Sequence, residues 1–260
     1  KEFSMNIGYN SCTAGAKKLR AKESELGFPI PWSIAIYSSR ADRWIEYVDG
    51  IISQGIEIGI YTYPIFGGMS FSEDMLDIYK KYSDCAFVLI VNSSEITDER
   101  ITRLKGINNI LISITGKNEQ ELKNAADILR INERFFAIHM YYGASNIDVL
   151  LKNETLKFYE EFTNSFVFYI PEIDCCNEAC DEMKVKVRKI RDDQHYAFVL
   201  MDLRADLLQI DSIISGGAYS FGFRSDGTIV TANGIVDEVK IDIRENSLVD
   251  ILIMLNKAGK

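Results

Sequence analysis

Ala86-Phe-Val-Leu-Ile-Val91 and Ile110-Leu-Ile-Ser-Ile114 are the two stretches that decide the fold class. Both are short, apolar and rich in β-branched residues, and a segment with helical start signals lies between them. Continuous apolar runs of this length are typical of strands buried on both faces of a parallel sheet. The two runs therefore predict one β-α-β unit.

The same pattern repeats in both directions along the chain. Five further apolar runs lie at residues 33–37, 56–61, 135–140, 166–170 and 196–201. The distance from one run to the next is the length that a strand, a crossover helix and two loops need. Seven such units predict an α/β fold, a parallel (β/α) TIM-like barrel that is full or partial.

Helix start signals lie between the runs. Ser70-x-x-Glu73 and Asn118-x-x-Glu121 have the pattern of a capping box, in which a side chain at the helix start accepts from the backbone three residues on. Acidic residues follow Thr97, where the helix dipole favours them. These signals predict helices after the second, third and fourth runs.

The repeating pattern of apolar runs and helical segments ends after Asp202. Residues 219–232 alternate around Ser225-Asp226-Gly227, which predicts a β-hairpin, and a final helix is expected from about Asn246. We therefore predict an N-terminal extension (1–32), a (β/α) barrel (33–215) and a small C-terminal hairpin–helix appendage (216–260).

Composition excludes several classes of protein. The 260 residues are 47% hydrophobic, which excludes a disordered chain. The net charge of −9 disfavours nucleic-acid binding. No apolar run reaches the roughly 18 residues of a membrane helix, and no signal-peptide core follows Lys1. We expect a soluble, cytoplasmic protein with reduced thiols and no membrane or nucleic-acid partner.

Two segments resemble a known family. Residues 87–104, followed by 109–116, resemble the middle of a radical SAM barrel, with Asn92, Ser113 and Gly116 at the family's turn positions. Residues 221–232 and 243–252 are similar to the SPASM-type extension of its peptide-modifying members. The resemblance covers roughly residues 33–256 and implies a barrel from the peptide-maturation branch. It also implies that Tyr63, Asn92 and Ser113 contact the cofactor.

The family's chemistry does not carry over. Its members hold a [4Fe–4S] cluster on a Cys-x3-Cys-x2-Cys loop after the first strand and cleave S-adenosylmethionine. Here no cysteine lies between Cys12 and Cys85, and Thr62-Tyr63-Pro64 stands where the family has Gly-Gly-Glu-Pro. Ala218 and Ala232 stand where the extension would have cysteines. The sequence predicts a cluster-less relative without a cofactor. S-adenosylmethionine with an iron–sulfur cluster is the alternative.

Cys175, Cys176 and Cys180 are the one thiol cluster in the chain. Cys176 and Cys180 are one helical turn apart and could supply two metal ligands, but two or three thiols do not complete a four-ligand site. We expect free thiols and no metal.

The catalytic candidates follow predicted strands. His139 lies on the fifth run, Glu172 follows the sixth and Asp202 ends the seventh, where barrel enzymes carry their functional groups. A buried, hydrogen-bonded histidine and a helix-capping Asp202 are the structural alternatives.

The expected ligand is a peptide or a small polar molecule. Tyr63 and Tyr141 add aromatic side chains to the rim that these candidates would form. Two function classes remain open. The first is a cluster-less binding or accessory protein in peptide maturation, a pseudoenzyme. The second is an enzyme, either one whose cluster loop is absent from this sequence or one that uses His139, Glu172 and Asp202.

Overall fold

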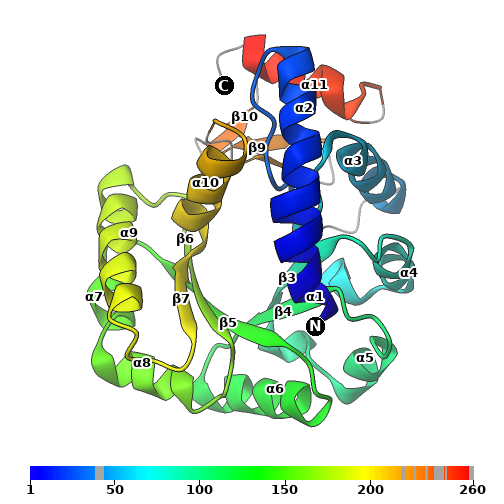
Figure 1. The fold of residues 1–260 in the computed structure, drawn as a ribbon. Coiled ribbons are helices and arrows are strands. Elements are labelled where there is room, and N and C mark those ends of the chain that lie inside the picture. Colours follow the sequence, from blue (N-terminus) through cyan, green and yellow to red (C-terminus); the bar gives the residue numbers. More distant parts are fainter. Residues whose placement is uncertain are drawn as a thin grey trace. The chain divides into compact units, whose positions relative to one another are not determined.

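The computed structural model describes residues 1–38, 44–217, 221–224, 227–231, 234–236, 243 and 245–257. It confirms the predicted fold class, an α/β fold with a mostly parallel sheet that matches a partial TIM-like barrel (Figure 1). In the described residues the strand order is β10-β9-β8-β1-β2-β3-β4-β5-β6-β7. The strands are β1 (Ala35–Tyr37), β2 (Thr62–Phe66), β3 (Ala86–Asn92), β4 (Ile110–Thr115), β5 (Phe136–Tyr142), β6 (Phe166–Pro171), β7 (Val199–Asp202), β8 (Phe221–Arg224), β9 (Ile229–Thr231) and β10 (Gly234–Val236).

Helices lie between the parallel strands, before β1 and after β10. They are α1 (Glu2–Met5), η1 (Asn6–Gly15), α2 (Ala16–Leu26), α3 (Trp44–Ile58), η2 (Gly68–Phe71), α4 (Glu73–Lys81), η3 (Ser93–Glu95), α5 (Asp98–Arg103), α6 (Glu119–Ile131), α7 (Ile147–Leu150), α8 (Asn153–Glu160), α9 (Asn177–Asp192), α10 (Leu203–Ile214) and α11 (Leu248–Lys257). Within the described part of the chain, none of them has the length and apolar character that crossing a bilayer requires.

The chain forms two compact units. Unit 1 contains Lys1–Leu89, Leu104–Ile110 and Leu207–Lys260, and unit 2 contains Ile90–Arg103 and Leu111–Asp206.

In unit 1, the C-terminal hairpin continues the sheet from β1. Strand β8 pairs with β1 in parallel, with Ile36 opposite Phe223, and β9 pairs with β8 in antiparallel fashion. The predicted turn residues Ser225 and Asp226 lie outside the described residues. Helix α11 is tied to α3, because the Leu248 N–H donates to Gln54 Oε1 at 2.7 Å. The predicted hairpin and final helix are both present.

An N-terminal helix packs on the amino ends of the strands of unit 1. It runs through α1, the π-helical segment η1 and α2. Asn6 Nδ2 donates to Ser83 O at 2.7 Å and to Cys85 O at 2.8 Å, just before β3. Ser11 Oγ lies 2.8 Å from Thr62 Oγ1 at the start of β2. These contacts are buried or partly buried, so one side of the segment 1–26 packs into the core of the unit.

Two glycines permit this close approach. A Cβ on Gly59 would lie 2.6 Å from both Gly15 O and Leu19 N, and one on Gly15 would lie 2.7 Å from Gly59 O. Gly59 also has φ +100°, a left-handed conformation that a glycine adopts freely.

The predicted strand at residues 56–61 is wrong. Residues 56–58 are the last turn of α3, and the strand β2 begins at Thr62. The buried positions Ile51, Ile52, Gly55 and Ile58 have helical spacing, so the apolar stripe of the helix extends into the run. Gly59 ends the helix. The apolar run at residues 56–61 therefore contains the end of α3 and the turn after it, and no strand.

The predicted cap at Ser70 is also wrong, whereas the cap at Asn118 is confirmed. Ser70 lies in η2 and donates to Gly67 O, while Ser72 Oγ accepts from Met75 N at the start of α4. Asn118 Oδ1 accepts from Glu121 N at 3.0 Å at the start of α6.

Candidate functional site

The sheet of unit 2 has two different faces. Side chains alternate along a strand, and residues paired across parallel strands share a face. The pairs His139–Phe168 and Phe168–Met201 therefore lie on one face. The pairs Met140–Tyr169 and Tyr169–Asp202 lie on the other.

Helices cover the second face. Tyr169 Oη donates to Leu150 O of α7, and Figure 1 shows α7, α8 and α9 along one side of β5, β6 and β7. Tyr169, Asp202, Leu200 and Val167 are all buried there. We call this the helix-covered face.

The first face is mostly buried but has two exposed side chains, and we call it the open face. Its members on β4–β7 are Ser113, Ala137, His139, Tyr141, Phe166, Phe168, Ile170, Val199 and Met201. Tyr141 is 42% exposed and Val199 is 44% exposed. The Phe166 and Phe168 rings stack, with centroids 5.6 Å apart. The open face therefore presents aromatic and aliphatic side chains to solvent at two places, Tyr141 and Val199.

A neutral polar pair lies within the open face. Ser113 Oγ is 3.1 Å from His139 Nδ1, and the His139 side chain is buried. Burial lowers the pKa of His139 to about 3, although the contact with Ser113 opposes this shift. The imidazole is therefore uncharged at neutral pH. It keeps one ring N–H for hydrogen bonding but lacks the acidic proton of an imidazolium that a general acid would donate.

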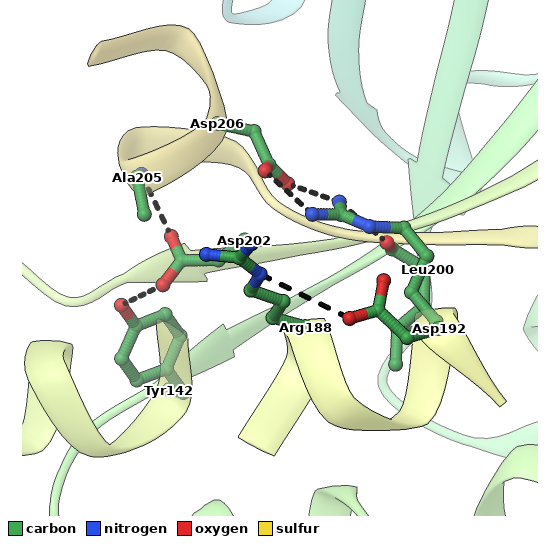
Figure 2. Close-up of polar contacts among 8 residues, drawn as sticks. Tyr142, Arg188, Asp192, Leu200, Asp202, Ala205 and Asp206 are labelled. Carbon is green, nitrogen blue, oxygen red and sulfur yellow. Dashed lines mark hydrogen bonds and ion pairs between the residues drawn. The ribbon is translucent and has the colours of Figure 1, made fainter. Parts of the chain in front are cut away.

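Asp202 lies on the helix-covered face, together with a tyrosine from β5. Tyr142 Oη donates to Asp202 Oδ2 at 3.1 Å, and Asp202 Oδ1 accepts from Ala205 N at 3.1 Å (Figure 2). The second contact confirms Asp202 as the cap of α10. Burial raises the pKa of Asp202, whereas its two hydrogen bonds lower it. Burial and the neighbouring Asp202 charge raise the pKa of Tyr142.

An ion pair joins α9 to α10 beside this carboxylate. Arg191 binds both oxygens of Asp206, at 2.8 and 3.1 Å, and also donates to Leu200 O. A two-bond pair of this kind fixes orientation as well as distance. It holds the helices that flank Asp202.

The thiol cluster lies at the carboxyl end of β6. Cys180 Sγ is 3.7 Å from Cys175 Sγ, and Arg204 Nη1 donates to Cys180 Sγ at 3.1 Å. Cys176 is exposed at the N-cap of α9. In the part of the chain that the structure describes, no three His, Cys, Asp or Glu side chains are placed to hold a metal ion.

The remaining predicted site residues lie apart. Asn92 is exposed at the end of β3, where its N–H donates to Glu95. Glu172 is exposed after β6. Tyr63 is fully buried, and its hydroxyl donates to Ile60 O at 2.9 Å. The structure therefore joins Ser113, His139 and Tyr141 on one face and places Asp202 on the opposite face.

A hollow of about 420 Å³ in unit 2 shares Val199 with the open face. Nine residues between Ile190 and Leu200 line it, including His195. It lies at the amino end of β7, away from the carboxyl ends where barrel ligands bind. We give it no catalytic role.

The sequence reasoning missed the pairing of Tyr142 with Asp202. The period-two alternation was a usable signal, because it places Tyr142 and His139 on opposite faces of β5. The pairing itself depends on the register of three strands, which the sequence does not show.

Comparison with known proteins finds matches by structure alone. No protein-family model and no curated protein sequence matches the chain. Streptococcus suis SuiB bound to S-adenosylmethionine is similar over 92% of this chain and 67% of that chain, with a TM-score of 0.63 and 14% identity. SuiB bound to precursor peptide SuiA gives a TM-score of 0.64 at 12% identity, over 92% of this chain and 68% of that chain.

A second protein in the solved structures is similar as well. Native anSMEcpe with bound AdoMet matches with a TM-score of 0.59 at 13% identity, over 85% of this chain and 80% of that chain. At such low identity the likeness concerns the fold. The chain thus shares the fold of these solved structures.

The residues present do not fit the iron–sulfur cluster that the fold implies. Such a cluster needs cysteine thiolates after the first strand, and the sequence has none between Cys12 and Cys85. At the end of β1, the Tyr37 ring stacks on Phe66 at 4.7 Å. The Thr62 hydroxyl is engaged by Ser11, and Tyr63 by a backbone carbonyl, so neither offers a free polar group to a cofactor.

Proposed function

We propose that this protein is a cluster-less, radical SAM-like pseudoenzyme that binds a peptide as an accessory in peptide maturation. The open face of β5–β7 carries the proposal, because it combines half-exposed apolar side chains with a buried neutral Ser113–His139 pair. In this proposal the barrel spans residues 33–215 and a SPASM-like extension spans 216–260. We place the function in the cytoplasm.

The chemistry of the open face suits an extended peptide. Tyr141 offers a rigid aromatic contact at low entropic cost, and Val199 adds aliphatic area beside Phe166. SuiB with its precursor peptide and anSMEcpe with a bound peptide are structural neighbours that support a peptide ligand.

A binding experiment tests the peptide site. Random displayed peptides are selected on the immobilised full chain, and affinities of the enriched peptides are measured for two variants. Tyr141→Ala removes an exposed ring from the open face, and we expect it to weaken binding about tenfold or more, as for an interface hot spot. Val185→Ala is the matched control, because Val185 is 67% exposed on α9. Equal affinity of both variants would place the peptide elsewhere.

A second experiment tests the absence of the cluster. The purified chain is treated anaerobically with iron and sulfide, and bound iron is then measured by elemental analysis and visible absorption. We expect no stoichiometric cluster, because the cysteine loop is absent. A stable [4Fe–4S] cluster would instead establish the enzyme alternative and refute the accessory role.

A further inference from the structure

The clustered thiols of unit 2 form a site that the proposed peptide function does not use. We propose that Cys175 and Cys180 are a reactive dithiol that exchanges with small aliphatic disulfides and closes to an intramolecular disulfide. Arg204 is the residue that assists this exchange. The argument depends on the geometry of these three side chains and is independent of peptide binding.

The two sulfurs are close enough to join. Cys175 Sγ and Cys180 Sγ are 3.7 Å apart, and a disulfide needs about 2.05 Å, so a small side-chain rotation brings them together. The backbone on both sides is held in place. Cys175 N donates to Glu172 O at 3.0 Å, and Cys180 N donates to Cys176 O at 3.1 Å in the first turn of α9.

A cation lies against one of the sulfurs. Arg204 Nη1 donates to Cys180 Sγ at 3.1 Å. Thiolate sulfur is the nucleophile in disulfide exchange, and a neighbouring guanidinium stabilises its negative charge. Cys180 is therefore the attacking sulfur.

Cys175 has the properties of the second, resolving thiol. Burial, followed by the hydrogen bond and charge of Cys180, raises the pKa of Cys175 to about 12. Once Cys180 is bonded to another sulfur it carries no charge, so it no longer raises the pKa of Cys175. Both side chains are half-buried and so remain within reach of a small reagent, whereas Cys176 is exposed beside them.

The exchange balances with a small disulfide, RSSR, as the oxidant. The Cys180 thiolate attacks one sulfur, the S–S bond of RSSR breaks, and RS⁻ leaves. Cys175 then loses its proton to solvent and attacks Cys180 Sγ, which expels the second RS⁻. Both thiolates take up protons to give RSH. The protein loses two electrons and two protons in total, and RSSR gains them.

The experiment uses oxidised glutathione as the probe. The full chain is incubated with glutathione redox mixtures near neutral pH, free thiols are alkylated, and the tryptic peptide 158–184, which holds all three cysteines, is analysed by mass spectrometry. We expect this peptide to lose two hydrogens while Cys176 remains alkylated. The Cys176→Ser variant should form the same bond at the same rate. Cys175→Ser should stop at a mixed disulfide on Cys180.

Arg204 variants test the assisting role. Arg204→Gln should slow closure about tenfold, the loss expected for one charge-assisted contact, and Arg204→Lys should keep most of the rate. Circular dichroism of the reduced proteins checks folding. If the Gln variant does not fold, the closure rate of the Lys variant tests the role of Arg204. Three alkylated cysteines under oxidising mixtures, or a bond that includes Cys176, would overturn the dithiol. An unchanged rate in a folded Arg204→Gln protein would overturn the role of Arg204.

Discussion

Asp211 is a buried carboxyl group in unit 1. It lies on α10 with only 1% of its surface exposed, and its Oδ1 accepts from Trp32 N at 2.5 Å. Burial raises its pKa from 3.8 to about 8, and the charge of Glu23 adds to the shift. The folded protein therefore keeps a proton at Asp211 that the unfolded chain has lost.

We predict that Asp211→Asn removes a pH dependence of stability. Below pH 3.8 both states of the wild type hold the proton, so the stabilisation is complete. From there to about pH 8 the folded state alone holds it, and the free energy of unfolding falls by about 1.4 kcal/mol per pH unit. The Asn variant keeps the acceptor for Trp32 without this dependence. Urea unfolding of the wild type and the variant, at pH steps from 4 to 8, measures the free energy of unfolding of each. The same pH dependence in both proteins would contradict a raised pKa for Asp211.

His139 has the opposite dependence. Its pKa is lowered from 6.5 to about 3, so the unfolded chain takes up a proton that the folded state refuses. The stabilisation is present above pH 6.5 and is lost as the pH falls toward 3. We predict that the imidazole stays neutral in the folded protein at pH 5. In the His195→Gln variant His139 is the one remaining histidine, and its NMR signal should not shift between pH 7 and pH 5. A titration midpoint of this NMR signal near pH 6.5 would show that the His139 ring is exposed and would contradict the prediction.

At the residue scale, the sequence predicted the role of a side chain better than its hydrogen-bond partner. It offered a buried, hydrogen-bonded state for His139 and a capping role for Asp202, and the structure has both. It could not predict Ser113 as the partner of His139 or Tyr142 as the partner of Asp202, because both pairs join different strands. Such partnerships depend on strand register, which is set by packing over the whole sheet.

At the element scale, the contact between Gly15 and Gly59 fixes how the N-terminal helix meets the turn after α3. We predict that Gly59→Ala destabilises unit 1 by about 2–6 kcal/mol, the sum of the strain at positive φ and the overpacking against Gly15 and Leu19. Gly8→Ala is the control. Apart from its chain neighbours and its own helix backbone, no atom lies within 4 Å of a Cβ at Gly8, so this helical substitution should stabilise by about 0.5–1 kcal/mol.

Urea unfolding of the two alanine variants distinguishes close approach from a general effect of helix propensity. Similar changes in the free energy of unfolding would show that the Gly15–Gly59 contact carries no special cost.

The strand predicted at residues 56–61 is the error at the element scale. Apolar content alone does not separate the end of a buried helix from a strand, and the helical spacing of Ile51, Gly55 and Ile58 was the decisive signal.

At the scale of the whole molecule, the sequence predicted the partial barrel because six of the seven predicted runs overlap strands of the sheet, so one wrong run did not change the fold class. The N-terminal segment carries no such run, and its division from the barrel as residues 1–32 stays a prediction. The contacts that bear on it are long-range. Asn6 and Ser11 bind groups near residues 62 and 83–85, and local sequence patterns do not report contacts at such separations.

We predict that unit 1 does not fold without residues 1–26. Asn6→Ala alone leaves the carbonyls of Ser83 and Cys85 without their donor, at a cost of about 1–3 kcal/mol for each lost bond. Lys17→Ala is the control, because Lys17 is exposed on α2. Both tryptophans of the chain, Trp32 and Trp44, are buried in unit 1, so their fluorescence reports on this unit. The deletion should give the emission of water-exposed tryptophan, and Asn6→Ala should lower the urea midpoint. Native emission from the deletion variant would show that the segment is a separable extension.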